Sequence, residues 1–192
     1  MPSARTLSTA RSREAVIDAA LELFALKGFD STTAEEVAAR AGVSPRTFFR
    51  YFETKESVVF YRDYGFMRSF AAAYLEQPAT VSDFRALRAA MVVQAQGVAG
   101  MRSRMETYRA AVDSSAVLLG HEHRHFDDHA TTIRAAILGR RPGASDDDAR
   151  MLASVALALF QRALRQWLGG PSTATLADLI GGEFDRLARL AR

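Results

Sequence analysis

The sequence contains no cysteine and no long hydrophobic run, and each absence excludes a class of protein. Without cysteine there is no disulfide framework, no thiol nucleophile and no thiolate metal site. No segment reaches the roughly 18 apolar residues that a membrane-spanning helix requires, and the N-terminal residues lack the apolar stretch of a signal peptide. We therefore expect a soluble cytoplasmic protein with no membrane partner.

Acidic residues are missing from residues 1–13, which contain Arg5, Arg11 and Arg13. A short basic segment can follow a nucleic-acid phosphate backbone, and it can equally be a solvated terminus. We expect residues 1–10 to form a flexible basic arm.

What the chain does have is apolar residues at helical spacing, with no alternating pattern typical of strands. Its hydrophobic fraction of 48% is sufficient for a core. The pattern predicts an all-α protein. The expected helices are Thr9–Lys27, Thr33–Ala41, one that begins at Ser44, Thr54–Pro78, Ser82–Val98, Met101–Asp113, Ser114–Leu138, Asp146–Leu168 and Thr173–Leu190.

The end of the first helix is clearly marked. Lys27 complements the helix dipole, Gly28 can adopt a left-handed cap, and Phe29 can fold back onto Phe24. The helix carries one apolar face, which we expect to be buried. Its members are Val16, Ile17, Ala20, Leu21, Leu23 and Phe24.

Residues 32–55, TTAEEVAARAGVSPRTFFRYFETK, predict two short helices joined by a tight turn. Thr33 and Glu36 can form a capping box at the start of the first. Ser44 can cap the second, with Pro45 at its first position. Gly42 suits the turn, because glycine tolerates a positive φ angle. This is the shape that places a helix in the major groove of DNA.

The side chains of this segment divide into two sets. Ala38 is small enough for the helix crossing, and an apolar set should pack inward, namely Val37, Val43, Phe48 and Phe52. The outward set is polar, basic and aromatic: Arg46, Thr47, Phe49, Arg50, Tyr51 and Lys55. Arg46 and Arg50 are one turn apart, so both can enter one groove. Arginine can bind guanine with two hydrogen bonds, while Thr47, Tyr51 and Lys55 can contact phosphates.

The run from Glu14 to Val59, with AGVS, the T-F-x-x-YF run and the following K-E in order, resembles the DNA-binding domain of TetR-family transcriptional regulators. The resemblance covers about the first third of the chain. It implies an all-α homodimer of about nine helices that binds a palindromic operator in double-stranded DNA. It also implies a C-terminal domain that binds a small-molecule effector and thereby weakens DNA binding.

The resemblance also implies roles for single residues. It implies DNA contacts by Thr47, Phe49, Arg50, Tyr51 and Lys55, with Thr33 and Ser44 capping helices at phosphates. Phe49 stands where the family very often has tyrosine, so a phosphate hydrogen bond is missing and the ring can pack on a thymine methyl or a sugar instead. We expect an N-terminal three-helix helix-turn-helix domain at 1–56 and a helical ligand-binding and dimerisation domain at 57–192.

Residues 57–192 show amphipathic helices without a comparable motif. A faint similarity to actinobacterial family members suggests an acyl-CoA-like or other hydrophobic effector. The candidate ligand-binding residues are Tyr64, Phe66, Met67, Met91, Met105, Tyr108 and Phe126. Ordinary core packing explains each of them as well.

The last two helices form the dimer interface in the family. The candidate interface residues are Leu152, Val155, Leu159, Trp167, Leu176, Ile180 and Phe184. Gly181 and Gly182 each cost a helix about 1 kcal/mol relative to alanine. Close approach to another helix explains the pair, and so does a kink.

His121, His125 and His129 share one helix face at a spacing of four residues. Two histidines at this spacing can bind Zn²⁺ or Ni²⁺. Alternatively, the three histidines form a solvated, mildly pH-sensitive face that binds no metal. We expect no metal, no cofactor and no catalytic residue, because no activated nucleophile is visible. The function expected is a ligand-responsive DNA-binding repressor. The alternatives are a DNA-binding dimer without an effector and, last, a metal-dependent helical enzyme that uses the histidine face.

Overall fold

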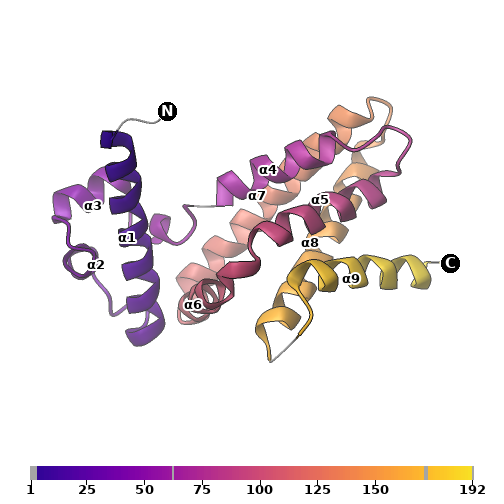
Figure 1. Cartoon of the computed structure of the whole chain (residues 1–192). Coiled ribbons are helices and arrows are strands. Elements are labelled where there is room, and N and C mark those ends of the chain that lie inside the picture. The colour runs from indigo at the N-terminus through magenta and orange to yellow at the C-terminus, as the bar shows by residue number, and fades with distance from the viewer. Residues whose placement is uncertain (1–3, 62, 171–172, 192) are drawn as a thin grey trace. The chain divides into compact units, whose positions relative to one another are not determined.

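The computed structural model describes residues 4–61, 63–170 and 173–191 (Figure 1). Within these ranges, the side chains of residues 4–7, 63–66, 68 and 99 are outside the description. Every regular element of the described ranges is a helix, which confirms the all-α prediction. None of these helices combines the length and the apolar character needed to cross a membrane.

The chain divides into two compact units. The first unit comprises Met1–Arg62 and Ser103–His123, and the second comprises Asp63–Arg102 and Arg124–Arg192. The elements of the first unit are α1 (Ala4–Lys27), α2 (Ala34–Arg40), α3 (Pro45–Tyr51), the short 3-10 helix η1 (Glu56–Val58), nearly all of α6 (Arg102–Asp113) and the start of α7 (Ala116–Arg140).

Helix α1 begins at Ala4, five residues before the predicted start at Thr9. Residues 4–10 are therefore helical and not a flexible arm, since no proline or glycine interrupts the helix there. The predicted end is confirmed: Gly28 has a φ of 86°, and the rings of Phe24 and Phe29 meet edge-to-face with centroids 5.0 Å apart.

The predicted helix from Thr54 to Pro78 is wrong at its beginning. The Ser57 amide donates to Thr54 Oγ1 at 3.2 Å, η1 follows, and α4 (Asp63–Leu75) begins only at Asp63. Val58, Val59 and Phe60 are all buried. Three consecutive residues cannot share one face of an α-helix, so the core of the first unit accommodates them by interrupting the helix.

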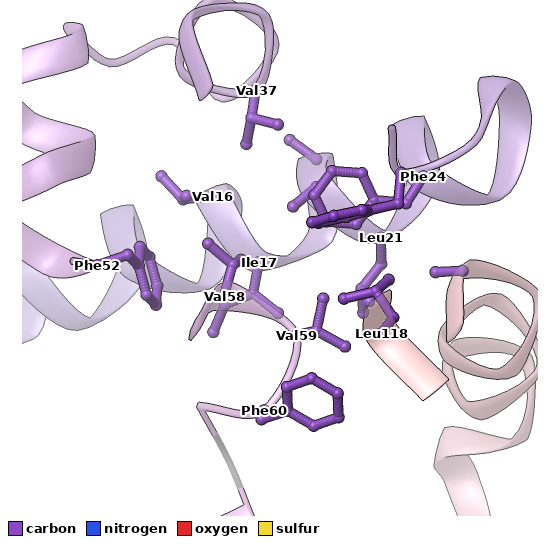
Figure 2. Close-up of a cluster of buried hydrophobic side chains, with 14 of the residues drawn as sticks. Val16, Ile17, Leu21, Phe24, Val37, Phe52, Val58, Val59, Phe60 and Leu118 are labelled. Carbon is purple, nitrogen blue, oxygen red and sulfur yellow. The ribbon is translucent and has the colours of Figure 1, made fainter. Parts of the chain in front are cut away.

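The core of the first unit gathers apolar side chains from all its helices (Figure 2). Helix α1 contributes the predicted face, of which only Leu23 remains half-buried. Ala111, Val112 and Leu118, from α6 and α7, complete the cluster. Each fully buried aliphatic or phenyl side chain contributes about 1.5–3 kcal/mol. Helices α1, α2 and α3 therefore share their core with residues of α6 and α7 that lie more than fifty positions later in the sequence.

The second unit contains α4, α5 (Asp83–Gly97), η2 (Ala99–Met101), the rest of α7, α8 (Asp146–Leu168) and α9 (Leu176–Leu190). Helix α9 packs against α5 and α8, and α4 packs against α5. The ion pairs Arg88–Asp185 and Arg162–Glu183, at 3.0 and 2.9 Å, join α9 to these two neighbours. Helix α8 begins as predicted, with Ser145 as its cap.

A buried polar cluster joins the ends of α4 and α7 to the start of α5. The Arg140 side chain, 4% exposed, donates to Asp83 at 2.5 Å and to the carbonyl oxygens of Pro78 and Val81. The Tyr74 hydroxyl donates to the same carboxylate at 2.7 Å. Burial, together with the hydrogen bond to Asp83, raises the pKa of Tyr74 to about 12.

Candidate nucleic-acid interface

Helices α2 and α3 meet across the predicted glycine turn. Gly42 has a φ of 68°, a conformation that L side chains rarely adopt. The Val43 amide donates to the Ala38 carbonyl at 2.9 Å, and Ala38 is fully buried at the crossing. The turn residue and the small residue therefore have the predicted roles.

Both helices begin at the predicted caps. The Glu36 amide donates to Thr33 Oγ1 at 3.1 Å, and the Thr33 amide donates back to Glu36 Oε2 at 2.8 Å. At α3 the Thr47 amide donates to Ser44 Oγ at 3.2 Å, with Pro45 at the first helical position. These bonds fix where each helix starts, and hence which side chains of α3 face outward.

The inward face of α3 is aromatic. Phe48 is fully buried and Phe52 is 3% exposed, with their ring centroids 5.7 Å apart. Val37 of α2 is buried beside them in the same cluster, and Val43 is half-buried. Thus the inward set lies as predicted and anchors α3 to the core.

The opposite face of α3 is exposed and basic. Arg46 and Arg50 are exposed, Phe49 is 51% exposed, and Thr47 and Tyr51 are half-buried. In the described part of the chain, no carboxylate forms an ion pair with either arginine. The positive charge of this face is therefore uncompensated and available to a polyanion.

Two basic residues of α1 and α2 are neutralised. Lys27 pairs with Glu36 at 2.6 Å and Arg40 with Glu22 at 2.8 Å, and both pairs join α1 to α2. The hydrogen bond from Lys27, and then that from the Thr33 backbone, lowers the pKa of Glu36. These two basic residues are therefore engaged within the unit, whereas Arg46 and Arg50 on the exposed face of α3 have no ion-pair partner among the described residues.

Tyr51 has two cationic neighbours. Arg50 lies with its guanidinium carbon 5.0 Å from the centroid of the Tyr51 ring, and it donates to the tyrosine hydroxyl at 3.1 Å. Arg13 of α1 lies 5.3 Å from the same centroid. The sequence placed Arg13 in the basic segment of residues 1–13 and gave no sign of this contact, because no local pattern relates residue 13 to residue 51.

Lys55 is held by the loop between α1 and α2. Its Nζ donates to the carbonyl oxygens of Phe29 and Thr32 at 2.8 and 2.9 Å and lies 3.9 Å from the centroid of the Phe29 ring. This ammonium group therefore joins the loop to the segment after α3. A phosphate contact by Lys55 stays a prediction, and it would use an ammonium that already donates two hydrogen bonds.

The residues predicted to contact a ligand are divided between the two units. The second unit holds Met67, Met91 and Phe126, the first unit holds Met105 and Tyr108, and the side chains of Tyr64 and Phe66 are outside the described part. Met67 and Met91 are buried, so core packing accounts for both. Ligand contact by this set stays a prediction.

The residues predicted for a dimer interface lie in two environments within the single chain. Five of them are buried within the second unit of the single chain: Leu159, Trp167, Leu176, Ile180 and Phe184. They face the protomer's own core because α8 and α9 pack on each other and on α5. Leu152 and Val155 are half-buried, and Met151 beside them is 60% exposed. Dimer contact by this set stays a prediction.

The histidines of α7 lie in different surroundings. His121 stacks on Phe60, with centroids 6.1 Å apart, whereas the rings of His125 and His129 are 6.4 Å apart. Burial, and then the charge of His125, lowers the pKa of His129. Across the described residues, no three His, Asp or Glu side chains come close enough together to hold a metal ion.

Comparisons with known proteins agree with this geometry. The family model "Bacterial regulatory proteins, tetR family" matches residues 16–61, which include α2, the turn and α3. The transcriptional regulator TcmR of Streptomyces glaucescens is 37% identical over 89 residues, 46% of this chain and 39% of that protein. The chain thus spans well under half the length of this curated relative.

Solved structures match over most of the chain. SmeT, the repressor of the multidrug efflux pump SmeDEF of Stenotrophomonas maltophilia, superposes with a TM-score of 0.62 at 22% identity, over 93% of this chain and 89% of that chain. A TetR-family regulator from Mesorhizobium loti gives a TM-score of 0.59 at 19% identity, over 95% and 97%. At such identities the likeness shows the fold alone.

Two capped helices joined by a glycine turn, with an exposed basic face that has no ion-pair partner among the described residues, define the chain as a helix-turn-helix protein. The family match over residues 16–61 narrows the class of this helix-turn-helix further. Residues 16–61 thus carry the helix-turn-helix of the TetR family of bacterial transcriptional regulators, and the chain shares its fold with the repressor SmeT.

Proposed function

We propose that this chain is a cytoplasmic transcriptional repressor that binds a palindromic operator as a homodimer and leaves it when a small molecule binds to residues 57–192. The observation that carries the proposal is the exposed face of α3, on which Arg46 and Arg50 lack ion-pair partners within the described structure. A helix with such a face, anchored by buried phenylalanines, suits the major groove.

The side chains of α3 have different roles in DNA recognition. Arg46 and Arg50 bind base edges, with guanine the preferred partner of a guanidinium. Thr47 and Tyr51 contact phosphates and fix the register of the helix. Phe49 is half-exposed without a hydroxyl, so it packs on a thymine methyl or a sugar. Because a symmetric dimer presents two such helices, the operator is a palindrome.

Dimerisation uses the less buried positions of α8 and α9. Met151 of α8 and Leu190 of α9 are 60% and 75% exposed, and Leu152 and Val155 are half-buried. Large exposed apolar side chains on two neighbouring helices are typical of a surface that a partner covers. The second copy is needed because one α3 helix reads only half of a palindrome.

The effector is a small hydrophobic molecule, with acyl-CoA-like compounds the first to test. SmeT, whose fold this chain shares, has been solved as a complex with triclosan. That complex supports a ligand-binding role for a protein of this fold. The alternative is a DNA-binding dimer without an effector. A thermal-shift screen of acyl-CoAs, fatty acids and aromatic metabolites separates the two, because a ligand of the folded state raises the melting temperature.

The proposal is tested by DNA selection followed by two substitutions. The wild-type chain should enrich a palindrome from a random duplex pool and bind it with strong salt dependence. Arg50→Ala and Tyr51→Ala should each lower operator affinity by about 10-fold to 100-fold with an unchanged circular dichroism spectrum. Arg150→Ala, which removes an exposed arginine of α8, is the control and should bind normally. Full operator affinity in both α3 variants would contradict the assignment of the recognition helix.

A further inference from the structure

Arg13 occupies an unusual position for a residue outside the helix-turn-helix. Its guanidinium carbon lies 4.9 Å from the centroid of the Tyr61 ring and 5.3 Å from that of Tyr51, and it donates a hydrogen bond to the Tyr61 hydroxyl. Within the described structure, its Nε is buried and has no hydrogen-bond partner. No ion pair of the described residues neutralises this charge.

The two tyrosines are themselves fixed by α3. Tyr51 is the last residue of that helix, and its ring meets Phe52 edge-to-face at 6.4 Å. Tyr61 meets Phe52 in the same way at 5.5 Å. Since Phe52 is buried, the aromatic side of the cluster cannot shift without disturbing the core. Arg13 therefore joins the middle of α1 to the exposed end of the recognition helix.

Arg50 completes the cluster on the DNA-facing side. It lies over the Tyr51 ring and donates to the hydroxyl of Tyr51. The orientation of Tyr51 thus decides where the Arg50 guanidinium rests. A cation over an aromatic ring is held by the ring quadrupole, and the planar guanidinium suits this contact better than an ammonium.

We propose that Arg13 is a positioning residue for operator recognition: it fixes the ring of Tyr51 and, through that ring, the guanidinium of Arg50. The inference rests on the proposed function. It differs from a phosphate contact by Arg13 itself, because the Arg13 side chain is half-buried with both tyrosine rings and the Tyr61 hydroxyl as its partners. What matters at this position is the shape of the guanidinium and not only its charge.

The test uses Arg13→Lys, which keeps the charge and removes the planar fork. Arg11→Lys is the matched control, because Arg11 is an exposed arginine of the same helix. Dissociation constants are measured for the selected operator and for a scrambled duplex at several salt concentrations. Arg13→Lys should weaken operator binding by about 10-fold, leave scrambled-duplex binding and the salt slope unchanged, and so lower specificity. Arg11→Lys should change neither.

A second background shows whether Arg13 acts through Tyr51. In Tyr51→Leu protein, whose residual operator binding is measured at low salt, adding Arg13→Lys should cause no further loss. A positioning role predicts this coupling, whereas a general effect on stability lowers both backgrounds equally. Equal losses in both backgrounds, or a change in melting temperature without a change in specificity, would overturn the inference.

The remaining outcomes also test the positioning role of Arg13. If Arg13→Ala lowers the salt slope by about 1 and weakens operator and scrambled duplex equally, Arg13 contacts a phosphate and the inference is wrong. If wild type enriches a palindrome and Arg13→Lys binds it normally, only the inference fails. If wild type enriches no sequence, the proposed function fails with it.

Discussion

The helix-turn-helix and the α8–α9 pair are both made of capped helices, yet their side chains follow the sequence pattern to different degrees. Helices α2 and α3 have seven residues each, and caps and one glycine fix both ends, so every side chain has one possible face. Helices α8 and α9 have 23 and 15 residues, and each carries buried apolar residues as well as an exposed one, Met151 or Leu190. Caps therefore determine where a long helix begins, while its neighbours determine which face is buried.

The largest expected effect is the loss of stability when one buried aromatic ring is removed from either region. Phe48 of α3 and Phe184 of α9 are both fully buried. Replacing either with alanine should lower the free energy of unfolding by about 3–5 kcal/mol, because it removes apolar contacts and leaves a cavity. Urea denaturation followed by circular dichroism measures the change. Phe49→Ala, at a half-exposed ring on the same helix as Phe48, should change stability by less than about 0.5 kcal/mol. Equal losses for Phe48→Ala and Phe49→Ala would contradict the assigned faces of α3.

A pH effect between pH 10 and pH 12 should arise from Tyr74 in the second unit. Tyr74 has a pKa of about 12, against an ordinary value near 10. Below pH 10 the phenol is protonated in both the folded and the unfolded chain, so the full stabilisation is present. As the pH rises from 10 towards 12, the unfolded chain loses its proton first and stability falls, by roughly 2–3 kcal/mol in total.

The measurement compares wild type with Tyr74→Phe at pH 9 and pH 11.5. The variant should lose less stability over this interval, since its ring cannot ionise. Parallel curves for wild type and Tyr74→Phe would contradict the raised pKa.

Lys55 distinguishes a structural lysine from one that binds DNA. Lys55→Met should lower the free energy of unfolding by about 1–2 kcal/mol, because the carbonyl oxygens of Phe29 and Thr32 lose a charged donor. If Lys55 is held only by the loop, the salt slope of DNA binding stays at the wild-type value. A slope reduced by about 1 with unchanged stability would show that Lys55 contacts a phosphate instead.

The smallest effects come from two glycines and should have opposite signs. Gly42→Ala should destabilise the chain by about 1–2 kcal/mol, because its φ of 68° is unfavourable for alanine. Gly182→Ala should stabilise α9 by about 1 kcal/mol, since a Cβ there meets no atom within 4 Å and alanine favours the helix. Thermal unfolding of both variants measures this. If Gly182→Ala instead weakens self-association in sedimentation experiments, Gly182 lies in the subunit interface.

The candidate site was largely predictable because its signals are local. Thr33 with Glu36, and Ser44 with Thr47, are three residues apart, so their hydrogen bonds follow from the order of the sequence. The position of Gly42 was equally visible. The contacts of Arg13 with Tyr51 and of Lys55 with Phe29 were not visible, since they join residues 38 and 26 positions apart with no periodic pattern between them.

Elsewhere the errors have a common cause. The predicted helix from Thr54 failed because three consecutive apolar residues, Val58 to Phe60, are taken up by the core of the first unit. Phe184 and Ile180, which were predicted for a dimer interface, are covered by α5 and α8 in the same chain. In both cases periodicity identified the residues that would be buried but not the partner that would bury them.

The sequence by itself determined the helices, their caps, the turn at Gly42 and the outward basic face of α3. These features depend on hydrogen bonds and φ angles within a few residues of each other. Only the tertiary structure decided that residues 103–123 pack with the N-terminal helices, that Lys55 is bound by a loop, and that Arg13 lies against Tyr51. Such contacts depend on how distant segments share one core, and side-chain periodicity carries no information about that.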